Sequence, residues 1–274
     1  MKLLLLTLSI LFASIGTNYA QGCVAIRGNS TCGLHATSNN TRIKGNFDLQ
    51  VNYRYFKSFR HFRGSEEETH RIEEGTEVIN NSHFADIGLS YSLSDRWTIN
   101  MILPFVHHTR SSMYEHGGNP PNGLGDRHTT KSYGLSDIRL EASYWLFKPG
   151  IKTFNYAVGM GVKLPTGSYD YNDLFYNQGE NKDQNILKVV DQSIQPGDGG
   201  FGLSLSLQGF HAINHNLTWV NNLYYLFNVE KTNGVLTRNG SSEFSCPDQF
   251  ALQTGLELAV QNKLKLFVGG RMEG

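Results

Sequence analysis

The feature of this sequence that most constrains its fold is a strict alternation of apolar and polar residues, repeated along the chain. In residues 47–55 every second side chain is apolar: Phe47, Leu49, Val51, Tyr53 and Tyr55. Successive side chains of a β-strand point to opposite faces, so this pattern predicts a strand with one apolar face and one polar face. The pattern recurs at 87–93, 97–103, 138–146, 154–164, 201–208, 217–228, 249–260 and from 264 onward.

The connections between these segments alternate between long and short. The long polar connections are 57–82, 107–133, 165–198 and 229–248, and the short turns are 94–96, 148–150, 211–216 and 261–263. A soluble sandwich also alternates in its strands, but it does not usually sort its loops in this way. Outer-membrane barrels have short periplasmic turns and longer extracellular loops. We therefore predict an all-β, antiparallel transmembrane β-barrel with its N-terminus on the periplasmic side and its long loops outside.

The composition agrees with this class and argues against others. After residue 20 no stretch approaches the 18 or so apolar residues of a membrane helix. Lysine plus arginine equal aspartate plus glutamate at 24 each, so no positive excess points to nucleic acid. The 29 glycines and 12% aromatic residues suit a protein with many turns and an aromatic girdle at each membrane interface. The partners that we expect are membrane lipid and a small solute.

The first 20 residues have the pattern of a secretory signal peptide. Lys2 is followed by an apolar run from Leu3 to Ile15, and the segment ends at Ala20. The run is shorter than the roughly 20 residues of a membrane-spanning helix. We predict export through the Sec pathway, with 1–20 as the signal peptide, 21–45 as an N-terminal periplasmic segment and 46–274 as the barrel domain. A membrane anchor, or a lipoprotein attached at Cys23, is the alternative.

The sequence has three cysteines, Cys23, Cys32 and Cys246. An exported protein meets an oxidising compartment, so a Cys23–Cys32 disulfide is expected, which leaves Cys246 unpaired. A zinc site would need more ligands at closer spacing, so we predict no metal at these residues.

The predicted strand count is odd. Bacterial single-chain barrels have an even number of strands because both termini lie on the periplasmic side. We count nine, and the sequence given ends at 269–274 without the terminal aromatic residue common in outer-membrane proteins. We therefore expect that the intact barrel has ten to twelve strands and that this chain lacks its C-terminal part.

Three local patterns resemble a known family. They are Gly134-Leu135-Ser136-Asp137-Ile138-Arg139-Leu140, Lys163-Leu164-Pro165-Thr166-Gly167 and Gly197-Asp198-Gly199-Gly200. Their order resembles a family of outer-membrane barrels assigned to transport in the phenol meta-cleavage degradation pathway, over residues 84–270. The resemblance implies passage of small, often apolar or aromatic compounds, with no cofactor and no catalytic motif. The same residues also have structural explanations, since proline ends a strand and glycine frees the backbone.

Polar side chains on the strand face opposite the apolar one are the candidates for the barrel lumen. They are Asp48, Gln50, Asn52, Arg54, Asp137, Arg139, Glu141, Asn155, Lys163 and Gln208. Charges of both signs in a lumen set up a transverse field that restricts which solutes pass. Alternatively, they form a salt-bridged plug that fills a narrow barrel. Both interpretations remain open at this point.

Most of the histidines fall in the predicted outer loops: His61, His70, His83, His107, His108, His116 and His128. Imidazole is a common metal ligand, but their spacing fits no metal-binding motif, and solvated loop positions explain them. No motif nominates a nucleophile with its base, so we predict that the protein is not an enzyme. The expected function is an outer-membrane channel or transporter for small solutes. A structural or binding barrel that uses its long loops is the alternative.

Overall fold

The computed structural model describes residues 44–64, 66–148, 150–237, 240, 242–261 and 264–274. The predicted signal peptide, the Cys23–Cys32 disulfide and nearly all of the 21–45 segment lie outside these residues. No helix in the described part is long and apolar enough to cross a membrane.

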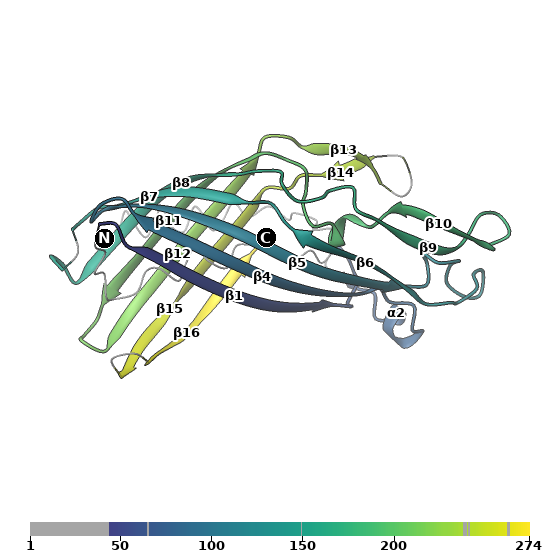
Figure 1. The fold of residues 1–274 in the computed structure, drawn as a ribbon. Helices are drawn as coiled ribbons and strands as arrows, with labels where there is room; N and C mark the ends of the chain where they lie inside the picture. The colour runs from purple at the N-terminus through teal and green to yellow at the C-terminus, as the bar shows by residue number, and fades with distance from the viewer. Residues whose placement is uncertain (1–43, 65, 149, 238–239, 241, 262–263) are drawn as a thin grey trace.

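Nine long antiparallel strands follow one another in chain order across a single curled sheet, which forms a half-barrel (Figure 1). They are β1 (Phe47–Ser58), β4 (Ile79–Ser92), β5 (Trp97–Ser112), β7 (Arg139–Trp145), β8 (Phe154–Lys163), β11 (Gly202–Ala212), β12 (Leu217–Asn228), β15 (Gln249–Gln261) and β16 (Leu264–Glu273). Each corresponds to one of the nine alternating segments, so the predicted all-β antiparallel architecture is confirmed. Short turns join neighbouring strands at one end, as the connection lengths indicated.

The predicted long connections contain regular structure that the sequence patterns did not indicate. They hold three small hairpins and a helix: β2 (Phe62–Arg63) with β3 (Glu66–Glu67), α2 (His70–Glu73), β9 (Asn172–Gln178) with β10 (Gln184–Val189), and β13 (Thr232–Leu236) with β14 (Glu243–Ser245). A 3-10 turn also spans Gln192–Ile194. These segments gather at the end of the sheet opposite the short turns (Figure 1).

The boundaries predicted for two of the loops were wrong. β4 begins at Ile79, within the predicted loop 57–82, and β5 continues to Ser112, where it pairs with β6 (His128–Leu135). The loop prediction for 107–133 failed because these strand extensions carry polar residues on both faces. Two polar faces hide the alternation that a membrane-facing strand shows.

A break separates β6 from β7, although both pair with β5. β5 pairs with β7 up to Ile102↔Arg139 and with β6 from Phe105↔Leu135. Between them, the Ser136 N–H donates to the carbonyl of Pro104 at 2.8 Å. Proline has no N–H to complete a ladder, so the pairing is interrupted over residues 136–138.

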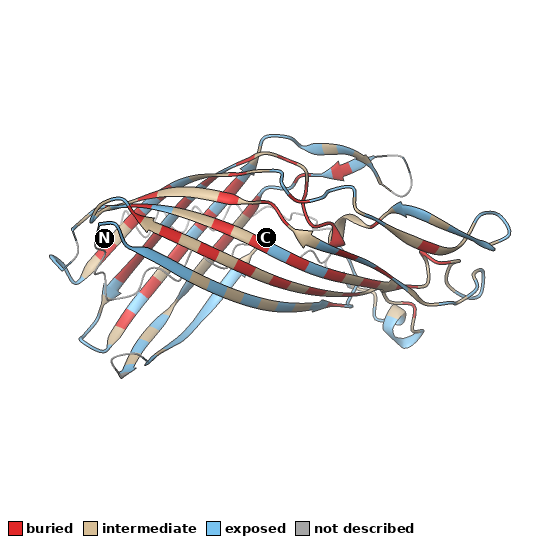
Figure 2. Cartoon of the chain, in the orientation of Figure 1, coloured by how far each residue is buried: buried red, intermediate tan, exposed pale blue. Residues whose placement is uncertain are grey.

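The two faces of the sheet differ sharply in burial (Figure 2). In β4, buried residues alternate with half-buried ones along the whole strand, and the buried set includes Asn80, Ser82, Asp86 and Ser90. The other face carries large exposed apolar side chains such as Val51, Met160 and Leu205. The sheet is therefore polar inside and apolar outside, the reverse of a soluble protein.

The edges of the sheet are β1 and β16. Among the described residues, β1 pairs only with β4 and β16 pairs only with β15. One ion pair connects the two edges, from Arg54 Nη1 to Glu273 Oε1 at 3.1 Å.

Candidate solute path through the barrel interior

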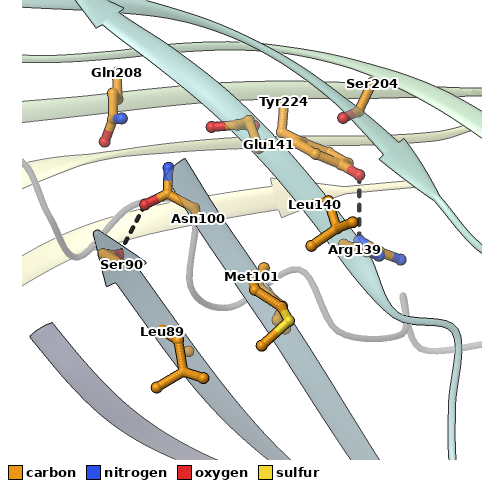
Figure 3. A pocket seen from close by; sticks show the side chains of 12 residues that line it. Leu89, Ser90, Asn100, Met101, Arg139, Leu140, Glu141, Ser204, Gln208 and Tyr224 are labelled. Atoms are coloured by element: carbon orange, nitrogen blue, oxygen red, sulfur yellow. Dashed lines mark hydrogen bonds between the residues drawn. The ribbon is translucent and has the colours of Figure 1, made fainter. Parts of the chain in front are cut away.

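The middle of the interior carries a network of small polar side chains. Ser90 of β4 donates to the side-chain oxygen of Asn100 of β5 at 2.7 Å, and the Asn100 amide donates to Ser143 of β7 at 3.4 Å. These residues lie on the inward positions of three consecutive strands, and Figure 3 shows Ser90 and Asn100. The network leaves the interior hydrophilic, with neutral donors and acceptors.

Arg139 reaches across the interior from the first position of β7. Its guanidinium donates to the Tyr224 hydroxyl of β12 at 3.4 Å (Figure 3). It also donates to the Gln249 side-chain oxygen of β15 at 3.1 Å. Two strands, β8 and β11, lie between β7 and β12 in the sheet. Because the contact skips these strands, it crosses the concave side of the sheet and narrows the space there.

Glu141 projects inward two residues later on β7, opposite two glycines of β8. A Cβ built on Gly159 would lie 2.6 Å from Glu141 Oε1, and one on Gly161 would lie 2.4 Å from the Leu140 carbonyl oxygen. The missing side chain of Gly159 therefore makes room for the carboxylate, and that of Gly161 allows the close approach of the Leu140 backbone. A small pocket of about 20 Å³ lies beside it, lined among others by Asn100, Arg139 and Gln208. This volume admits about one water molecule.

An ion pair between Lys163 and Asp198 is buried at the outer end of the interior. The Lys163 ammonium contacts both oxygens of the Asp198 carboxylate, and the lysine side chain is 1% exposed. The same carboxylate accepts the Gly200 N–H at 2.9 Å. Asp137 lies beside this pair and accepts the backbone N–H groups of Gly167 at 3.0 Å and Asp198 at 3.1 Å. Charges from three chain segments therefore converge at one point.

Residues 190–198, which we call the inner segment, occupy the outer part of the interior. The Ser132 hydroxyl donates to the Ile194 carbonyl, and the Ser136 hydroxyl donates to the Pro196 carbonyl. Ser132 lies on an inward position of β6, so the inner segment packs against the concave face beside the β6–β7 break. Val190, Ile194 and Gln195 are fully buried there.

Arg110 of β5 contacts both the inner segment and the outer loop that follows β5. Its guanidinium contacts Glu115 at 3.1 Å, Asp191 at 3.4 Å and the Tyr114 hydroxyl at 2.8 Å. Burial raises the pKa of Tyr114 to about 12, with the neighbouring carboxylates acting in the same direction and Arg110 acting against them. Tyr114 therefore stays a neutral hydrogen-bonding partner at any physiological pH.

The opposite end of the interior contains a cluster of apolar side chains. Trp145, Ala157, Phe210 and Val220 form one buried cluster near the short turns, with the Trp145 and Phe210 rings 6.2 Å apart. The interior thus has three levels: an apolar cluster, a polar middle, and the charged level at the inner segment.

The residues predicted to face the lumen are spread over all these levels. Arg139, Glu141 and Gln208 line the pocket, while Asp137 and Lys163 belong to the charged level. Asn155 instead bonds the backbone of Phe147 in a short turn, at 2.8 and 3.0 Å, which is a structural role. The remaining four lie on the inward positions of β1 and do not line the pocket: Asp48, Gln50, Asn52 and Arg54.

Several residues of this interior were not among those predicted from the sequence. Asp198 lies in the Gly-Asp-Gly-Gly pattern, which the sequence analysis explained by backbone freedom alone. Tyr224 and Asn222 lie on inward positions of β12, and extending the alternation argument to residues 217–228 would have found them. The inner segment gives no periodic signal, because outside the short 3-10 turn at Gln192–Ile194 it has no regular structure.

Four of the seven histidines placed in outer loops lie in strands instead: His83 in β4, His107 and His108 in β5, and His128 in β6. His107 is exposed and His108 is buried, as neighbours in a strand must be. The described residues include no group of three or more His, Cys, Asp and Glu side chains that could hold a metal ion.

Comparison with known proteins identifies relatives at the level of a family. A family model described as "Putative MetA-pathway of phenol degradation" matches residues 72–273. No curated protein gives a significant match.

Two solved structures share part of the architecture. A FadL homologue from Pseudomonas aeruginosa is 10% identical, with a TM-score of 0.39, over 82% of this chain and 56% of that one. This chain therefore spans little more than half of that protein. The outer-membrane protein OprG from Pseudomonas aeruginosa is 10% identical, with a TM-score of 0.31, over 86% of this chain and 98% of that one. Scores this low carry no argument about function.

Proposed function

We propose that this chain, which belongs to the family described as "Putative MetA-pathway of phenol degradation", forms an outer-membrane barrel wall that passes small solutes through its polar interior. The observation that carries the proposal is the distribution of charge between the two faces. The outward positions of the described wall strands hold no Asp or Glu, while the inward positions hold Arg139, Glu141 and Lys163. Lipid contact on one side and water or solute on the other explains this division.

The interior geometry supports a narrow, gated path for the solute. The pocket in the polar middle holds about 20 Å³, which is too small for any organic solute. A solute from outside meets the inner segment first, and the Lys163–Asp198 pair holds this segment in place. Passage therefore requires the inner segment to move, which breaks this ion pair together with the contacts of the segment to Ser132, Ser136 and Arg110.

The chemistry of the pocket favours small solutes with one or two polar groups. Arg139, Glu141 and Gln208 offer donors and acceptors, and the Tyr224 ring offers an apolar surface. Hydroxylated aromatic compounds, the class to which phenol in the family description belongs, combine both properties. We take them as the first solutes to test.

The test is solute flux through the purified full-length protein in lipid vesicles and conductance in planar bilayers. We expect low conductance for the wild type and several-fold higher conductance for Asp198→Asn, which breaks the pair. Asp183→Asn is the matched control, because Asp183 is exposed at the tip of the β9–β10 hairpin. A folded barrel in which neither the wild type nor Asp198→Asn passes phenol or ions would refute the proposal.

A binding barrel is the second candidate, and the ordered outer hairpins favour it. The His128 ring of β6 stacks on Tyr176 of β9 at 4.4 Å, and His116 of the preceding loop stacks on Phe175 of β9 at 5.4 Å. A surface held in place by such ring contacts suits a protein that binds a partner outside the cell. This function would be favoured by a barrel that passes no solute or ions in any variant. Replacement of residues 179–183 at the hairpin tip should then abolish binding to the partner.

A further inference from the structure

Two cross-strand rows on the outward face stand out from the apolar surface around them. Strand register places Tyr55, His83, His107 and Tyr133 side by side across β1, β4, β5 and β6, and we call them the imidazole row. Two positions further along each strand, away from the short turns, the same register aligns a second row of outward residues. They are Lys57, Asn81, Thr109 and Lys131, which we call the basic row.

The imidazole row is a continuous surface of rings. The Tyr55 and His83 rings are 5.0 Å apart, His83 and His107 are 6.0 Å apart, and His107 stacks on Tyr133 at 6.4 Å. Tyr53 also bonds His83 Nδ1 through its hydroxyl at 2.6 Å. Tyr55 and Tyr133, the two tyrosines of the row, are 50% and 62% exposed. Their rings are therefore available to a ligand outside the barrel.

These rows lie at the outer boundary of the apolar band. On the side of the short turns, the next outward residues are aromatic and aliphatic down to Phe47, which pairs with Tyr91. Eight residues separate Tyr55 from Phe47, which at about 3.3 Å per residue and a tilt of about 40° is about 20 Å of height. This is close to the roughly 25 Å of a barrel's apolar band. The basic row is therefore at the level of lipid headgroups.

The charge of this surface is positive. No Asp or Glu occupies an outward position of β1, β4, β5 or β6. Lys57 and Lys131 are exposed, and neither has an ion-pair partner among the described residues. Asp173 of β9 is an acidic residue that contacts the row through the backbone of Lys131. Its two carboxylate oxygens accept the backbone N–H groups of Lys131 at 2.6 Å and Leu174 at 2.8 Å.

We propose that the basic row and the imidazole row bind the phosphate groups of an outer-leaflet glycolipid. The ammonium groups of Lys57 and Lys131 contact the phosphates, and the rings pack against the sugar and the first part of the acyl chains. The two lysines are three strands apart, about 14 Å at a strand spacing of about 4.8 Å, which suits a headgroup with two phosphates. This inference rests on the membrane insertion that the proposed function includes.

The test measures lipid binding by the full-length protein in zwitterionic detergent, with native mass spectrometry. The probes are lipopolysaccharide carrying its phosphates and the same lipopolysaccharide after enzymatic dephosphorylation. We expect wild-type protein to bind the phosphorylated form about tenfold more tightly, with binding weakened as NaCl rises from about 50 to about 500 mM. Lys57→Gln/Lys131→Gln should lose this preference, and each single variant should lose part of it.

The control is Lys148→Gln/Lys152→Gln, which removes the same charge beside a short turn at the opposite end. It should keep the full preference. Equal binding of the two lipopolysaccharide forms by the wild type, or an unchanged preference in Lys57→Gln/Lys131→Gln, would overturn the inference. A difference in gel migration between unboiled and boiled samples shows that each variant is folded.

Binding in detergent needs no conductance, so the two proposals fail separately. Protein that binds the phosphorylated lipid but passes no solute refutes only the transport function. Protein that passes solute but does not distinguish the two lipids refutes only this inference.

Discussion

The guanidinium of Arg54 in the first strand lies 3.1 Å from the carboxylate of Glu273 in the last strand, and so joins the two edges of the sheet. The same carboxylate accepts the Arg271 guanidinium at 2.7 Å, and Arg54 also covers the Phe84 ring at 4.4 Å. Among the described residues no backbone ladder connects β1 with β16. The Arg54–Glu273 ion pair is therefore a side-chain contact between two edges that share no described backbone pairing.

Reversing the charge of Arg54 should destabilise the folded barrel. Arg54→Glu places two carboxylates where the ion pair was, and we expect a loss of about 1 kcal/mol in the free energy of unfolding, because both partners are partly exposed. The double variant Arg54→Glu/Glu273→Arg should recover most of it. Urea titration of tryptophan fluorescence in detergent measures both. Additive effects of the two reversals would show that the residues do not interact.

Breaking the Lys163–Asp198 pair should cost more, because this pair is buried. Asp198→Asn leaves the ammonium without its counter-charge, and such changes cost about 3–5 kcal/mol. We expect new protease cleavage within residues 190–198 before the wall strands unfold. Limited proteolysis with mass mapping measures this, and Lys163→Met/Asp198→Asn should be less sensitive than Asp198→Asn alone. Identical cleavage in Asp198→Asn and wild type would show that the pair does not hold the inner segment.

Substitution of the β8 glycines should follow a graded order. In Gly161→Ala the new Cβ would lie 2.4 Å from a backbone oxygen, which cannot rotate away, so we expect the larger loss of stability. In Gly159→Ala the nearest atoms belong to the Ser206 and Glu141 side chains, which can move. Gly270→Ala is the control, because no atom lies within 4 Å of its new Cβ. Thermal unfolding of the three variants measures the order, and equal destabilisation by all three would contradict it.

Cys246 should resist alkylation in the folded protein. Burial, with the Asp198 charge beside it, raises the pKa of this thiol to about 11, and its Sγ donates to the Asp198 carbonyl at 3.2 Å. A raised pKa means less thiolate at a given pH. At about pH 8 we expect iodoacetamide to react at least about 100-fold more slowly than with the unfolded chain. A Cys23→Ser/Cys32→Ser background isolates this thiol. Equal rates in the folded and unfolded states would show that Cys246 is accessible.

The alternation of the sequence predicted the strands because a membrane wall needs one apolar face along its whole length. In segments such as 47–55 and 154–164 the predicted apolar face is therefore the outward face of the strand. The inward positions of Arg139, Glu141 and Lys163 follow from the alternation of side chains along their strands. Outside the apolar band this requirement ends. β6 carries Lys131 outward and Ser132 inward, so its sequence looks like a loop although it forms eight residues of strand.

The sequence by itself determined a sheet that is apolar outside and polar inside, because periodicity is a local property of the chain. The tertiary structure alone decided what fills the interior. Lys163 and Asp198 are 35 residues apart, and Arg139 and Gln249 are 110 residues apart. Contacts over such separations depend on how the sheet curls and where a non-periodic segment such as 190–198 settles. Neither leaves a pattern in the sequence, since each is set by the shape of the space that the strands enclose.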